Sequence, residues 1–164
     1  MPLMTKTNAV RLLETADIKH SIREYNTSDG EISGVAVARK IGQEPERVFK
    51  TLVTEGKNTG INVFVIPCDC ELDLKKAALA AGDKYIGMIR ERDLEFRTGY
   101  VHGGCSPIGM KKIFPAFIEE TASLFETIFV SAGRVGLQVE INPVDLAGIT
   151  GAVFSDLITE TPLK

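Results

Sequence analysis

The feature that most constrains the fold is a run at the centre of the chain, residues 99–112 of 164, that holds four glycines and one proline. Glycine is costly inside a helix or strand and proline removes a backbone donor, so this run is expected to form a loop. Loops of this composition can present backbone N–H groups to a negative oxygen. We therefore predict that the N–H groups of Gly103, Gly104 and Ser106 converge as an anion cradle or oxyanion hole. The plainer alternative is a tight turn between two strands.

Composition indicates a single globular domain spanning residues 1–164. With 44% hydrophobic and 25% charged residues, the chain is long enough to bury one sizeable core. No run approaches the roughly 18 apolar residues of a membrane span, and no apolar signal segment follows the first six residues. The three cysteines, an odd number, fit a reducing compartment better than a disulfide framework. We therefore expect a cytoplasmic protein without a membrane partner.

The charge of the chain argues against a broad basic surface that grips nucleic acid. Its formal net charge is −3 and its isoelectric point is about 5.5. Residues 75–134, which include the glycine-rich run, hold nine Lys and Arg against seven Asp and Glu. A polyanion is therefore expected to meet this middle third.

Apolar spacing and capping residues predict a mixed α/β chain. Helices are expected over residues 7–16, 33–41 and 73–81 and after Asn142, where a proline follows an N-cap. Strands are expected at 21–25, 49–54, 61–66, 127–131 and 136–141, with an edge strand first, a central strand at 61–66 and a hairpin turn at 132–135. Because strands outnumber helices and several are hairpin-linked, we expect a curled, barrel-like mixed sheet surrounded by helices.

Five short motifs, in order along the chain, resemble those of the YbaK/EbsC family. They are Val48-Phe49-Lys50-Thr51-Leu52, Leu72-Asp73-Leu74-Lys75-Lys76, Thr98-Gly99-Tyr100, Gly103-Gly104-x-Ser106-Pro107-x-Gly109-x-Lys111-Lys112 and Val130-Ser131-x-Gly133-Arg134-x-Gly136-Leu137. Each is weak alone, but together they make the resemblance specific, and it covers nearly the whole chain.

The resemblance implies a trans-editing aminoacyl-tRNA deacylase with a barrel-like mixed-sheet fold. Relatives include an editing domain inserted in prolyl-tRNA synthetase, and the implied substrate is Cys-tRNA, with proline tRNA as the carrier. A synthetase pocket for a small side chain cannot reject near-isosteres strongly, so a second site must hydrolyse the error. The implied partners are the acceptor end of a mischarged tRNA and prolyl-tRNA synthetase, and no cofactor or metal is implied.

The resemblance also implies the site residues. Lys50, an amine on an otherwise apolar strand, corresponds to the family's essential lysine, whereas a lysine chosen blind would usually face solvent. Gly103 and Gly104 correspond to the loop whose N–H groups stabilise charge on the ester carbonyl. The family's substrate-binding positions correspond to Tyr25, Ser106, Pro107, Ser131, Gly133 and Gln138. In cysteine-specific members the substrate's own thiol attacks its ester, so no protein nucleophile is required.

Two departures from the family pattern bear on amino-acid specificity. Gln138 stands where the cysteine deacylases commonly carry an aspartate, and residues 32–34 replace a segment in which many members have a phenylalanine. A neutral amide cannot hold a substrate ammonium by charge. Deacylation of another small aminoacyl-tRNA, such as Ala-tRNA, is therefore a second hypothesis, and a non-catalytic module that binds tRNA, nucleotides or a synthetase is a third.

The cysteines and histidines suggest rival chemistry that the sequence supports less well. Cys105 and His102 could form a nucleophile and base, although no third group is evident to orient the base. Cys68 and Cys70 have the spacing of half a metal site, but two histidines in the whole chain supply no second ligand pair. We expect these two cysteines to be structural residues at a strand end, and we assign His20 no partner.

Overall fold

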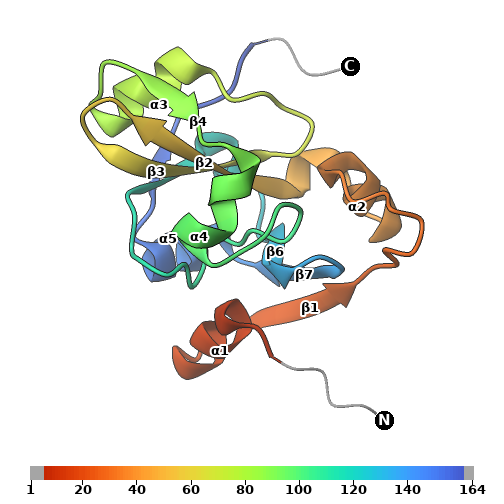
Figure 1. Cartoon of the computed structure of the whole chain (residues 1–164). Helices are drawn as coiled ribbons and strands as arrows, with labels where there is room; N and C mark the ends of the chain where they lie inside the picture. Colours follow the sequence, from red (N-terminus) through yellow and green to blue (C-terminus); the bar gives the residue numbers. More distant parts are fainter. Residues whose placement is uncertain (1–5, 161–164) are drawn as a thin grey trace.

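Two open β-sheets form the framework of the protein, as a computed structural model of residues 6–160 shows (Figure 1). The first five residues, where no signal segment was expected, lie outside the described part. The smaller sheet has the order β1-β7-β6 and the larger one β4-β2-β3-β5-β8. In Figure 1 the larger sheet lies above the smaller, which carries α1 beside β1.

The smaller sheet is antiparallel throughout. It contains β1 (His20–Glu24), β6 (Ile128–Arg134) and β7 (Leu137–Ile141), with β7 in the centre. The predicted hairpin between the last two strands is confirmed, and so is the edge position of β1. A register shift between Ser131 and Arg134 marks a β-bulge just before the turn.

The larger sheet is mixed. The hairpin of β2 (Phe49–Gly56) and β3 (Gly60–Pro67) is antiparallel, and β4 (Ile86–Met88) adds to β2 in the same sense. The other side of β3 pairs in parallel with β5 (Ala116–Glu119), which in turn pairs in parallel with β8 (Val153–Ser155). The central place predicted for residues 61–66 is confirmed, because β3 lies in the middle of the five strands.

The mixed α/β class is confirmed, but the curled, barrel-like sheet is wrong. Neither sheet closes on itself among the described residues, since each has a first and a last strand in its order. A single parallel bridge, between Val48 and Phe129, links the chain just before β2 to β6. Hairpin signals are local, and they cannot show whether successive hairpins share one sheet or divide between two.

Four of the five helices, α1, α2, α3 and α5, lie where their capping residues predicted them. They are α1 (Asn8–Thr15), α2 (Gly34–Lys40), α3 (Leu74–Ala81), α4 (Leu94–Thr98) and α5 (Pro143–Thr150), with 3-10 turns at Pro45–Arg47, Glu91–Asp93 and Glu120–Leu124. The side chains of Thr7, Ser33, Asp73 and Asn142 accept N–H bonds from the first turns of α1, α2, α3 and α5. Sequence reasoning missed α4, β4, β5 and β8, each five residues or fewer.

The main hydrophobic core joins the two sheets. Side chains from both sheets, α1 and α5 pack in one cluster, among them Leu13, Phe49, Val130 and Leu146. Residues 99–115, which include the whole glycine-rich run, contain no helix or strand, as predicted. This loop follows α4 and packs closely against the β6–β7 hairpin. The approach is so close that a β-carbon at Gly104 would lie only 2.8 Å from the backbone nitrogen of Val135. The loop and the hairpin therefore hold each other in place.

Candidate active site

A cavity of about 200 Å³ lies where four parts of the chain meet. These are the start of β2, the segment that leads into α2, the glycine-rich loop and the β6–β7 hairpin. Four of the predicted site residues, Lys50, Gly103, Ser131 and Gln138, are among its lining residues. β4 pairs only with Thr54–Gly56 of β2, so the beginning of β2 has no neighbouring strand on that side. Lys50 and the next residue lie in this part of β2, and both line the cavity.

Lys50 is half-buried in this cavity. Its ammonium group has no hydrogen bond and no ion pair to any of residues 6–160. A partly buried lysine ordinarily has a charged or polar partner. A lysine without one, on a cavity wall, is available to bind an anionic ligand.

The β-bulge of the hairpin positions Ser131. The backbone N–H of Gly133 donates to Ser131 Oγ over 3.2 Å, and Gly133 itself has φ +101°, a conformation that favours glycine. The oxygen of Ser131 is thus held as an acceptor while its hydroxyl proton stays free to donate. Gly133 does not line the cavity, and its contact with the site is this bond to the serine oxygen.

Of the three N–H groups predicted as donors, that of Gly103 is the one whose residue lines the cavity. Gly103 lines the cavity, has φ +84°, and its N–H finds no acceptor among the residues that the structure describes. The N–H of Gly104, however, donates to the carbonyl of Val101 over 3.0 Å, within the turn. The expected convergence of three N–H groups is therefore corrected, because Gly104 and Ser106 lie outside the cavity lining and Gly104 is already bonded.

The other predicted binding residues are structural or peripheral in this conformation. Ser106 is fully buried and its hydroxyl oxygen accepts the N–H of Ile108 over 3.2 Å, which shapes the loop. Pro107 follows it outside the cavity lining. Tyr25 comes directly after β1 and also lies outside that lining, although its hydroxyl oxygen is buried without a hydrogen-bond partner in the described chain.

The rival nucleophile does not have the properties that nucleophilic catalysis needs. Cys105 lines the cavity but is buried, and burial raises the pKa of its thiol to about 12. A thiol with this pKa is almost wholly protonated near neutral pH and is a poor nucleophile. His102 also lines the cavity, is exposed, and makes no hydrogen bond to Cys105 among the contacts of the described chain. Cys105 therefore serves as part of the cavity wall.

Sequence reasoning missed several wall residues. Thr51 follows Lys50 directly, and its hydroxyl is buried with no partner in the described part of the chain. Apolar wall residues come from α2 and α4 (Val37, Leu94) and from β2 and the segment before it (Val48, Phe49, Leu52). Both departures from the family pattern also lie in the wall, since Ile32, Ser33 and Gly34 line it together with Gln138.

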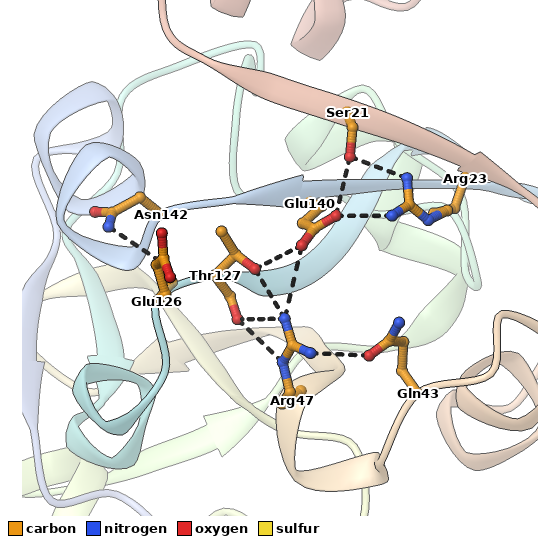
Figure 2. Close-up of polar contacts among 8 residues, drawn as sticks. All are labelled: Ser21, Arg23, Gln43, Arg47, Glu126, Thr127, Glu140 and Asn142. Carbon is orange, nitrogen blue, oxygen red and sulfur yellow. Dashed lines mark hydrogen bonds and ion pairs between the residues drawn. The ribbon is translucent and has the colours of Figure 1, made fainter.

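A larger cleft, of about 930 Å³, lies beside the start of β1 and the end of β7. Its main polar groups already bond to one another. Glu140 accepts hydrogen bonds from Ser21, Thr127 and Arg23, and Arg47 lies 3.6 Å from its carboxylate (Figure 2). The hydrogen bond from Thr127, followed by the bond from Ser21 and the positive charge of Arg23, lowers the pKa of Glu140. This network ties β1, β6 and β7 to the turn before β2, so we interpret it as structural.

Of the two cysteines after β3, Cys68 has a structural explanation. Cys68, directly after β3, is buried, its thiol contacts the carbonyl of Pro45 at 3.3 Å, and a β-carbon at Gly34 would collide with its own. Burial raises the pKa of Cys68 to about 12 and that of Cys70 to about 11. Over residues 6–160 no three His, Cys, Asp or Glu side chains form a metal-binding group, and no helix there has the length and apolarity to cross a membrane.

Comparisons with known proteins give a consistent result. A family model described as "Aminoacyl-tRNA editing domain" matches residues 33–149. The chain is 45% identical over 155 residues to the "Putative Cys-tRNA(Pro)/Cys-tRNA(Cys) deacylase EbsC" of Enterococcus faecalis, and the match covers 94% of each protein. A structure described as a "putative trans-editing enzyme for prolyl tRNA synthetase" has a TM-score of 0.81 at 24% identity, over 95% of this chain and 99% of the other. A second, of a protein described as hypothetical, has a TM-score of 0.85 at 20% identity, over 93% and 100%. At these identities the two structures show a common fold.

Proposed function

Because the chain belongs to the aminoacyl-tRNA editing domain family, we propose that it is a trans-editing deacylase that hydrolyses Cys-tRNA, with proline tRNA as the favoured carrier. The relative that is 45% identical is named for Cys-tRNA(Pro) and Cys-tRNA(Cys), which supports this choice of amino acid. The observation that carries the proposal is the unpaired ammonium of Lys50 in the same cavity wall as the unpaired N–H of Gly103.

In the proposed reaction the enzyme supplies geometry and charge while the substrate supplies the nucleophile. The cysteine sulfur forms a bond to its own ester carbonyl carbon, the bond from that carbon to the ribose oxygen breaks, and the thiol proton ends on the released hydroxyl. Water then opens the cyclic thioester to free cysteine. Gly103 N–H and the Ser131 hydroxyl donate to the carbonyl oxygen as it gains negative charge. The Lys50 ammonium binds the anionic end of the tRNA or that same oxygen.

A comparison of four substrates tests the proposal directly. Purified protein is mixed with Cys-tRNA(Pro), Cys-tRNA(Cys), Ala-tRNA(Pro) and Ser-tRNA, and release of the amino acid is measured. We expect the two cysteine esters to be hydrolysed fastest, because a hydroxyl or methyl group cannot replace an ionised thiol as the nucleophile. Equal rates on Ala-tRNA and Cys-tRNA would exclude the thiol-assisted reaction. Binding without hydrolysis of any ester would instead indicate a non-catalytic module.

Lys50→Ala provides the residue-level test. We expect it to reduce kcat/KM on Cys-tRNA by about 100-fold, as removal of a charge-stabilising group does in other sites. Lys57→Ala, at an exposed position just after the same strand, is the matched control and should retain wild-type activity. Wild-type turnover by folded Lys50→Ala protein would remove Lys50 from the site. A change in KM alone would assign it to tRNA binding, and a change in kcat would assign it to the ester.

The proposed partners follow from the substrate and from charge. A net charge of −3 gives the protein little electrostatic attraction for tRNA, so we propose that prolyl-tRNA synthetase helps deliver the mischarged acceptor end. The reaction then takes place in the cytoplasm, where tRNA is charged. Addition of the synthetase should lower the KM for Cys-tRNA(Pro) and leave the KM for Cys-tRNA(Cys) unchanged.

A further inference from the structure

The cavity is too small to enclose more than the extreme end of the proposed substrate. Its volume is about 200 Å³. Sites that enclose a drug-sized ligand have volumes of roughly 300–1,000 Å³. The cavity can therefore take the amino acid and its ribose, but not the unpaired nucleotides that precede the terminal adenosine of a tRNA. Those nucleotides must lie on the surface around the mouth of the cavity.

Ser33 and His102 mark this mouth, because they are the exposed members of the cavity lining in the described chain. On the side of Ser33, the acidic side chains of Asp29 and Glu31 already form ion pairs with basic residues at the end of α2. On the other side, His102 also lines an adjoining cleft of about 460 Å³. A ligand longer than the cavity can therefore continue past His102 into the adjoining cleft.

The surface beyond the mouth carries positive charge that the protein itself does not use. Residues 90–112 hold five Lys and Arg against three Asp and Glu, in a chain whose net charge is −3. Arg92 lines the adjoining cleft and, together with Arg90, a further cleft of about 360 Å³. Neither guanidinium forms an ion pair within the described chain. The carboxylates of Glu91 and Glu95 also line the adjoining cleft, so a phosphate is favoured there only where it lies at an arginine.

Phe96 presents an exposed aromatic ring beside these arginines. It lies on α4, is 77% exposed, and follows Arg92 by four residues in one continuous helical stretch, which places both side chains on the same side of the helix. The ammonium of Lys111 lies 5.9 Å from the centre of its ring, and the backbone N–H of Lys111 donates to the carbonyl of Thr98. Proteins that bind single-stranded nucleic acid combine aromatic rings, on which bases stack, with nearby cations that hold the backbone.

A strand that leaves the cavity past His102 brings bases and phosphates to these groups. We propose that Phe96 stacks with an unpaired base of the tRNA end that precedes the terminal adenosine, while Arg92 and Lys111 bind the phosphates beside that base. This inference rests on the proposed function and extends the binding site beyond the cavity. Two cations supply only a short contact, in keeping with the small electrostatic attraction that the net charge allows.

Binding of two non-hydrolysable compounds tests the inference without turnover. One is adenosine that carries cysteine through a 3′-amide, and the other is the same compound with two cytidine nucleotides before the adenosine. Titration calorimetry gives both affinities for wild-type protein, Phe96→Ala and Phe96→Trp. Tyr85→Ala is the matched control, because Tyr85 is 62% exposed and lines neither the cavity nor the two clefts beside it.

We expect wild-type protein to bind the trinucleotide more tightly than the nucleoside by about 10-fold or more. Phe96→Ala should weaken trinucleotide binding by about 5- to 100-fold, as for loss of one base–aromatic stack, and change nucleoside binding by less than about twofold. Phe96→Trp and Tyr85→Ala should keep the wild-type affinities. Arg92→Gln should reduce the slope of log affinity against log salt concentration by about 0.7, as for loss of one phosphate contact on a single strand. Arg11→Gln, at an exposed position on α1, should leave that slope unchanged.

Three results would overturn the inference. They are no preference for the trinucleotide in wild-type protein, unchanged trinucleotide affinity in folded Phe96→Ala protein, and equal losses on both compounds. Equal losses would mean that the ring acts on the cavity or on the fold rather than on the preceding nucleotides. These measurements involve no hydrolysis, whereas turnover of Cys-tRNA by wild-type protein reports on the proposed function, so the two failures are distinguishable.

Discussion

Replacement of Gly103 by alanine separates the catalytic from the structural role of the glycine loop. The added β-carbon would lie 2.8 Å from Ile32 Cδ1 and 3.4 Å from Val135 Cγ2, at φ +84°. The left-handed backbone alone costs an alanine about 1–2 kcal/mol, so we expect the free energy of unfolding to fall by about that amount. Ile32 also lines the cavity, so relief of the close contact crowds the site. Loss of a correctly aimed oxyanion donor costs about 100-fold or more in rate.

The assay is single-turnover hydrolysis of saturating Cys-tRNA beside chemical denaturation of the same variant. Gly82→Ala is the matched control, because Gly82 has φ +71° at the end of α3 and its β-carbon would meet nothing within 4 Å. The control should lose similar stability and keep its rate. Ile32→Val removes the Cδ1 atom, so Gly103→Ala in that background reports backbone strain without the close contact. A wild-type rate for folded Gly103→Ala protein would refute the oxyanion assignment.

Two further predictions follow from the raised pKa of Cys105 and the lowered pKa of Glu140. Because burial raises the pKa of Cys105 to about 12, Cys105→Ala should keep at least half of the wild-type rate on Cys-tRNA, and a loss of about 100-fold would support an enzyme nucleophile instead. Glu140→Gln should lower the free energy of unfolding by about 1–3 kcal/mol at pH 7, measured by urea denaturation. The pKa of Glu140 is lowered from 4.5, so its contribution is present above that pH and is lost as the pH falls. The difference between wild-type protein and Glu140→Gln should therefore shrink below pH 4.5, and a pH-independent difference would contradict this origin.

Much of the local structure could be predicted because the interactions that decide it span a few residues. Asp73 accepts the N–H groups of Lys75 and Lys76, and Asn142 caps α5 in the same way, so each helix start is encoded within one turn. The β6–β7 hairpin is also local, and its short turn pairs Arg134 with Leu137, although the register shift before the turn decides that Ser131 lies opposite Gln138. The order of motifs likewise predicted Lys50 and the glycine loop as site residues, and the structure places Lys50 and Gly103 in the wall of one cavity.

Only the tertiary structure decided which of these groups share a cavity and which are already bonded. The parallel pairing of β3 with β5 joins segments about 50 residues apart in the sequence. Strands of three residues, such as β4, are too short to show an alternation of apolar and polar residues. The sequence therefore could not predict the division into two open sheets. Gly103 and Gly104 cannot be told apart by residue type. In the structure Gly103 lines the cavity and its N–H has no acceptor in the described chain, whereas the N–H of Gly104 donates to the carbonyl of Val101. The ammonium of Lys50, unpaired in the described chain, has the same origin, because a hydrogen bond depends on neighbours that folding brings together from distant parts of the chain.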